Sequence, residues 1–111
     1  MYSKEIKTVI TNCAKLAYSD LKPGRFTVSM KIMDELKAAG LENSPENNRI
    51  VQEKLDKITG YDLPKVGEMI EFDNGGNCDV GGLVEEIDFI YEVVCVNDDY
   101  GNACEVPFDD F

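Results

Sequence analysis

The first 65 residues place apolar side chains at the spacing of amphipathic helices. Residues 3–18 repeat them every three or four positions, which predicts a helix that residues 20–24 interrupt with proline and glycine. A second helix is predicted from Val28 to Ala39, with Thr27 as its N-cap and Gly40 as the residue that ends it. Its expected buried stripe consists of Ile32, Met33, Leu36 and Ala39.

A third helix has the clearest start signal in the chain. Ser44 is placed to cap it, Pro45 fits the first helical position, and Glu46 puts a negative charge at the positive end of the helix dipole. The pattern turns Val51, Leu55 and Ile58 inward and ends at Gly60. Three helices are therefore expected before the chain changes character.

After Pro64 the hydrophobic period shortens from that of a helix to the alternation of β-strands. The segment 83–97 is long enough for two strands joined near Asp88, and Pro107 places the last strand at a sheet edge or at its own end. The other expected elements are a strand over 68–72, a turn-rich loop over 73–77, a tight turn over 98–102 and a final strand over 103–108. This order predicts an α+β protein with three N-terminal helices followed by a three- to five-stranded antiparallel sheet or small barrel.

The strand-and-turn order of residues 66–111 resembles that of small SH3-like or Tudor-like barrels. The positions that carry this resemblance are Val66, Gly67, Ile70, Phe72, Gly82, Val84, Ile87, Tyr91, Val93, Asp98, Asp99, Gly101, Val106, Pro107 and Phe108. It extends to the fold alone, and no specific family is identified. The resemblance implies binding of a peptide, a modified tail or a nucleic acid.

Charge divides the chain at the same place as the pattern. All eleven Lys and Arg residues precede residue 66, where nine acids accompany them, whereas residues 66–111 hold thirteen acids and no base. We therefore distinguish a near-neutral helical region, 1–65, which contains a helix-turn-helix-like pattern, from an acidic β region, 66–111, and expect them to form one compact unit. A segment without positive side chains repels itself, so a cationic partner is the simplest compensation.

The same features argue against several classes of function. A strongly negative surface is repelled by nucleic acid and by anionic lipid, so we expect the chain to bind neither. No apolar run is long enough to span a membrane, and the N-terminal residues lead into an amphipathic pattern instead of the apolar core of a signal peptide, so we expect a cytoplasmic protein. Without histidine or a paired-cysteine motif, no metal or other cofactor is expected. Without a catalytic motif, no enzyme is expected. Cys95 and Cys104 flank the predicted turn and either face each other across strands or remain reduced thiols.

The leading hypothesis is a small acidic inhibitor of a nucleic-acid-processing protein. Carboxylates two residues apart on a strand, such as Glu86 with Asp88, share one face at a separation of roughly 6.5 Å, a pitch that can imitate the charge of a nucleic-acid backbone. In size and charge the chain is similar to phage anti-CRISPR and anti-restriction proteins that act as DNA mimics and block a cationic channel, which would place it in the host cytoplasm. The expected partner-binding residues are Glu71, Asp73, Glu85, Glu86, Asp88, Asp98, Asp99, Tyr100, Asp109, Asp110 and Phe111.

Two other readings remain open. A winged-helix-type transcriptional regulator would read DNA through Asn47, Asn48 and Arg49 at the start of the third helix. An SH3-like adaptor would bind a basic peptide in an aromatic groove formed by Tyr91, Tyr100 and Phe108. A solvated acidic surface that serves only solubility would give the same composition.

Overall fold

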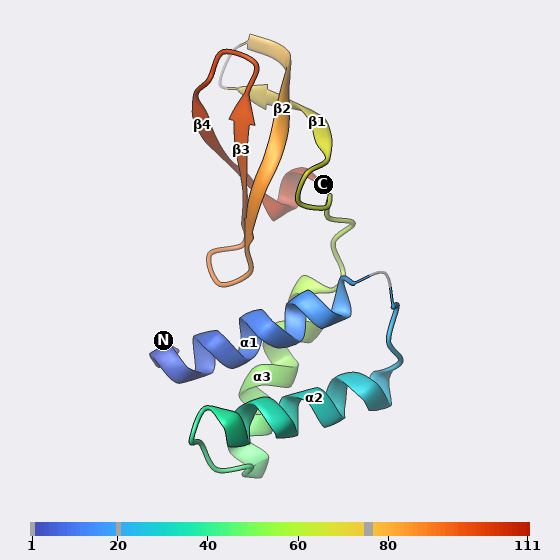
Figure 1. Cartoon of the computed structure of the whole chain (residues 1–111), viewed down its shortest axis with the longest axis vertical. Coiled ribbons are helices and arrows are strands. Elements are labelled where there is room, and N and C mark those ends of the chain that lie inside the picture. Colours follow the sequence, from blue (N-terminus) through green and yellow to red (C-terminus); the bar gives the residue numbers. More distant parts are fainter. Residues whose placement is uncertain (1, 20, 75–76) are drawn as a thin grey trace. The chain divides into compact units, whose positions relative to one another are not determined.

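The structure is a computed structural model of the 111-residue chain (Figure 1). It describes residues 2–19, 21–74 and 77–111, although not the side chains of residues 73–80. The order of elements is three helices followed by a four-stranded antiparallel sheet, which confirms the predicted α+β class. The chain divides into two compact units, Met1–Gly60 and Tyr61–Phe111, and each unit is described by itself.

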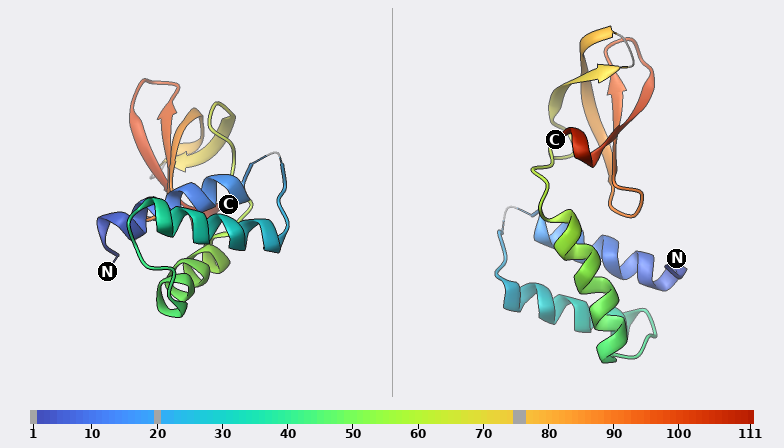
Figure 2. Two further views of the ribbon diagram at one scale, coloured as in Figure 1. Left: turned by 60° about the horizontal axis from the view of Figure 1, so that its bottom comes forward. Right: turned by 180° about the vertical axis from the view of Figure 1, so that it is seen from behind.

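The helical unit contains α1 (Lys4–Ala17), α2 (Arg25–Ala38) and α3 (Pro45–Ile58). Each pair of helices is in contact, and α3 crosses α1 and α2 (Figure 2). The three helices share one core, whose largest fully buried members are Val9, Ile10, Cys13, Ile32, Leu36, Val51, Leu55 and Ile58. At the end of α1, the Tyr18 hydroxyl donates a hydrogen bond to the carbonyl of Ile58, which fastens this turn to the end of α3.

Local signals set most helix ends as predicted. The Ser44 hydroxyl accepts a hydrogen bond from the backbone N–H of Asn47, with Pro45 at the first helical position. Gly40 ends α2 with a φ of 75°, and the amide of Leu41 donates to the carbonyl of Leu36, an arrangement that favours glycine because of its positive φ.

Two predictions for α2 were wrong. The helix begins at Arg25 with Gly24 as its N-cap, three residues before the predicted Thr27 cap. Met33 was expected in the buried stripe, yet its side chain is exposed, and Ala39 is only half-buried. Ile32 and Leu36 alone among the predicted stripe are fully buried, so much of the apolar surface of α2 lies outside the core.

The sheet unit is a meander of β1 (Met69–Asn74), β2 (Asn77–Asp88), β3 (Val93–Asp98) and β4 (Ala103–Pro107), with a 3-10 turn at Phe108–Asp110. Consecutive strands pair in order, and β4 is an edge strand that ends at Pro107, as predicted. The twelve-residue β2 pairs with both β1 and β3. The sheet alternative of the prediction is therefore the one observed.

Aromatic and β-branched side chains fill the inner face of this sheet. Phe108 is buried, and the rings of Tyr61 and Phe89 meet its ring edge-on with centroid distances of 5.6 and 6.1 Å. Directly opposite strand positions share a face, so the buried pairs Val84 with Val96 and Val94 with Val106 define which side is inner. The positions next to these residues along each strand then point to the outer face, because successive side chains of a strand alternate.

Candidate functional site: an acidic outer face of the sheet

A β-bulge in β2 concentrates negative charge on the outer face. Between Val84 and Glu86 the register with β3 shifts by one residue, so Glu85 is an extra residue and Glu86 lies opposite Cys95. Both glutamates are exposed. The bulge thus places two carboxylates where regular alternation would place one.

A third strand adds another carboxylate beside Cys95. Glu105 of β4 lies directly opposite Cys95 in the β3–β4 register and is exposed. The pKa of the Cys95 thiol is raised, first by burial and then by the charges of Glu86, Glu105, Asp88 and Glu85. Carboxylates from β2 and β4 therefore lie on both sides of Cys95 in β3.

A second acidic pair lies further along the same face. Glu71 of β1 is the register partner of Gly81, and the missing side chain of Gly81 leaves room for Asp99. A β-carbon built on Gly81 would lie 2.7 Å from the Asp99 Oδ2 atom, so the Asp99 carboxylate covers this position. Glu71 and Asp99 are therefore both neighbours of Gly81.

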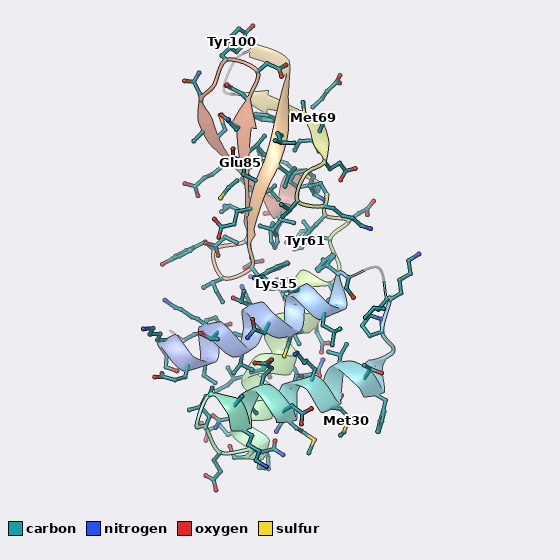
Figure 3. All side chains as sticks on the ribbon, in the orientation of Figure 1. Lys15, Met30, Tyr61, Met69, Glu85 and Tyr100 are labelled. Atoms are coloured by element: carbon teal, nitrogen blue, oxygen red, sulfur yellow. The ribbon has the colours of Figure 1, made fainter. Side chains whose placement is uncertain are left out.

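An apolar pair is on the outer face between these acids. Met69 of β1 lies opposite Leu83 of β2, and both side chains are exposed (Figure 3 shows Met69 and Glu85). We define the acidic face by Met69, Glu71, Leu83, Glu85, Glu86, Asp99 and Glu105. Protein–protein interfaces likewise combine an apolar core with a polar rim.

The carboxylates of Asp88 and Asp98 bind the backbone of turns. The Oδ1 atom of Asp88 accepts hydrogen bonds from the amides of Ile90 and Tyr91, at 2.9 and 3.0 Å. Asp98 is buried, and its Oδ1 atom accepts from the amides of Tyr100 and Asn102, at 2.9 and 2.8 Å. Both carboxylates have the local bonding that makes aspartate common in turns.

The remaining predicted partner residues are dispersed. Tyr100 is exposed in the β3–β4 turn, and the C-terminal 3-10 turn contains Asp109, which accepts a hydrogen bond from the Tyr61 hydroxyl at 2.7 Å, and Asp110, which is exposed. Phe111 is half-exposed, and Asp73 lies outside the described side chains. Among the predicted residues, Glu85, Glu86 and Asp88 therefore lie around Cys95, and Glu71 and Asp99 lie further along the same face.

Sequence reasoning missed Glu105, Met69 and Leu83. Glu105 was identifiable from its place in the last strand, opposite the segment before the turn over 98–102. Met69 and Leu83 alternate with residues that point inward, so their exposure followed once the inner face was known.

The residues on which the winged-helix and SH3-like hypotheses depend make local contacts or lie apart from one another. The Asn47 amide donates to the Glu42 carbonyl, and the Asn48 amide donates to the Asn43 side chain and the Ser44 carbonyl, so both fold back on the turn before α3. Phe108 belongs to the core, and Tyr91 and Tyr100 are in turns at opposite ends of β3. No cluster of three or more potential metal ligands occurs among the described residues.

Cys13 and Glu35 form a small polar group in the helical unit. Lys31 approaches Glu35 at 2.9 Å, and Asn12 donates a hydrogen bond to the same carboxylate at 3.1 Å. Burial, with Glu35 acting in the same direction, raises the pKa of the Cys13 thiol to about 12. A buried thiol that stays protonated is a poor nucleophile, so this group is structural.

Comparison with known protein families, curated proteins and solved structures found no match. In the part of the chain that the structure describes, no helix is both long and apolar enough to cross a membrane.

Proposed function

We propose that the chain is a protein-binding inhibitor whose acidic face engages a basic surface on a nucleic-acid-processing protein. The observation that carries this proposal is the convergence of Glu85, Glu86 and Glu105 around Cys95 in a segment that has no Lys or Arg after Lys65. Carboxylates from separate strands repel one another, and a cationic partner removes that repulsion on binding.

The bulge makes this face suited to a cluster of cations. Glu85 and Glu86 are consecutive and both exposed, so their charges lie closer together than the pitch of an ordinary strand allows. Surfaces that bind nucleic acid carry Lys and Arg at comparable density because they neutralise successive phosphates. The charge match supports occlusion of such a surface and speaks against direct binding of nucleic acid by the face itself.

Met69 and Leu83 supply the apolar part of the contact. Charged rims chiefly set association rate and specificity, whereas desolvated apolar anchors supply most of the affinity. The exposed pair lies on the same face as the glutamates, so one partner can contact both. Binding, and no chemical step, is the activity that we assign to this unit.

The proposal is tested by capture from bacterial lysate with the tagged full chain, at about 0.05 M and then at about 0.5 M salt, where screening shortens the range of charge interactions severalfold. Recovery of a nuclease or another nucleic-acid-binding protein at low salt, with loss at high salt and after nuclease treatment of the lysate has removed bridging DNA, is the expected result. Recovery of nucleic acid alone, or of nothing, would contradict it.

A further inference from the structure

The α2 helix is apolar on two sides, and one of them has no covering element in its own unit. Ile32 and Leu36 point into the core of the helical unit. Phe26, Met30 and Met33 remain 78, 42 and 41 % exposed, and Figure 3 shows Met30 on the side of α2 away from α1. A helix that is apolar on both sides is usually covered on both.

These three residues form a continuous stripe. They follow one another at spacings of four and three residues, which is the repeat of a helix–helix seam. Their exposed area is roughly 350 Å², within the range of the largest apolar patch on a typical monomer, and such patches often bind a partner. We call Phe26, Met30 and Met33 the α2 stripe.

We propose that the α2 stripe is a homodimer interface, on which the α2 helix of a second copy of this chain packs antiparallel. The stripe is self-complementary about its middle residue: a twofold axis near Met30 places Phe26 over the partner's Met33. An antiparallel arrangement also keeps the two copies of Lys37, which continues the same stripe, at opposite ends of the contact.

Charge decides which unit can meet its own copy. The sheet unit, 61–111, holds fourteen acids and one base, so two sheet units repel each other. The helical unit, 1–60, holds ten bases and eight acids, so contact through it carries little repulsion. In a twofold dimer, where identical surfaces meet, contact through the helices therefore carries far less repulsion than contact through the sheet.

The α2 stripe covers less than half of the area that a standard dimer contact buries on each partner, so it can supply only the apolar centre of the contact. A standard interface buries about 800 Å² on each partner, with an apolar centre and a polar rim. The α2 stripe supplies the centre, and the stems of the exposed neighbours Arg25, Thr27 and Lys37 supply the rim. A dimer through α2 does not depend on what the acidic face binds, although it would present two such faces at once.

Sedimentation equilibrium of the full chain over a range of micromolar concentrations tests the proposal. The expected result is a concentration-dependent dimer whose dissociation constant changes little with salt. Met30→Lys is expected to weaken dimerisation by roughly a hundredfold, because it buries a charge at the centre of the contact, whereas the matched variant Met69→Lys in the sheet unit should leave it unchanged. Met30 is partly exposed, so the helical circular dichroism of the variant should match that of the original chain.

Cross-linking separates the antiparallel arrangement from others. In a chain whose Cys78, Cys95 and Cys104 are changed to serine, a mixture of Phe26→Cys and Met33→Cys proteins should cross-link faster through a short bismaleimide than either protein alone. A chain that is monomeric at every concentration, or a dimer that persists in Met30→Lys, would overturn the proposal. A chain that stays monomeric and binds an acidic amphipathic peptide through α2 would also overturn it and assign the stripe to another protein.

Discussion

Cys95 lies directly opposite Glu105 in the pairing of β3 with β4, on the face that also carries Glu86. Cys104, by contrast, pairs with the buried Val96 and so points to the inner face. The two cysteines that flank the β3–β4 turn are therefore on opposite faces of the sheet. One of them marks the centre of the acidic cluster.

This arrangement predicts that Cys95 and Cys104 do not form a disulfide with each other. Disulfides need side chains that point toward one another. Peptide mapping after mild oxidation should find no Cys95–Cys104 link. A matched variant puts the second thiol directly opposite Cys95. In a chain with Glu105→Cys, and with Cys78 and Cys104 changed to serine, the new thiol should form a disulfide readily with Cys95. A Cys95–Cys104 disulfide in the unaltered chain would contradict the register.

The Asp98 carboxylate is predicted to stabilise the β3–β4 turn. Asp98→Ala leaves the amides of Tyr100 and Asn102 without their acceptor and should lower the free energy of unfolding by about 1–3 kcal/mol. Asp99→Ala, which removes an exposed carboxylate at the next position, should change it by less than about 0.5 kcal/mol. Urea unfolding compares the two variants, and equal effects would mean that Asp98 acts only through its charge.

Close packing at Gly82 is predicted to be essential for the inner face. A β-carbon there would lie 2.3 Å from Val96 Cγ1 and 2.9 Å from Phe72 Cε1, and both neighbours are core side chains. Gly82→Ala should therefore cost about 1–3 kcal/mol of unfolding free energy. Gly60→Ala, where the nearest such atom would be 3.8 Å away, is the control and should be nearly neutral. Similar stability of the two variants would show that β2 and β3 can move apart easily.

The Glu35 carboxylate is predicted to give the helical unit part of its acid sensitivity. Hydrogen bonds from Lys31 and then Asn12 hold the pKa of Glu35 below its ordinary value of 4.5. Because its folded pKa is depressed, this stabilisation is present above pH 4.5 and is lost as the pH falls through the lower folded pKa. Lys31 is partly exposed and screened by solvent, so the effect should be only about 0.5–1 kcal/mol.

Thermal unfolding of Glu35→Gln against pH measures this contribution. The variant should be less stable than the original chain at pH 7, and the difference should shrink as the pH falls below 4.5. Asp34→Asn, which makes the same change of charge at an exposed neighbour, is the control. A constant difference at all pH values would mean that Glu35 contributes through packing and not through its charge.

Local signals in the sequence predicted the elements well because they act within a few residues. Ser44 with Pro45 sets the start of α3, Gly40 ends α2, and Pro107 ends the edge strand. Tertiary packing decided what remained. Since α2 is apolar on both sides, periodicity alone did not show that Met33 lies outside the core.

The candidate site was predicted in part for a similar reason. The acidity of residues 66–111 indicated that a binding face would lie on the sheet. The bulge that places Glu85 beside Glu86 depends on pairing with β3 and has no signature in the alternation of β2. Asp98 was expected at the surface because turns are usually exposed. Its side chain is buried instead, and the carboxylate accepts hydrogen bonds from the backbone of the turn.

Charge reversal on the acidic face tests the central claim most directly. The test variant changes Glu85, Glu86 and Glu105 to lysine, and it spares Asp88 because that carboxylate holds a turn. The control changes Glu42, Glu46 and Glu53, three exposed acids of the helical unit, so both variants have the same net charge. Capture from lysate at about 0.05 M salt then compares the two with the original chain. We predict that the original chain and the control retain the same nucleic-acid-binding proteins and that the sheet variant loses them. Equal capture by both variants would contradict the account.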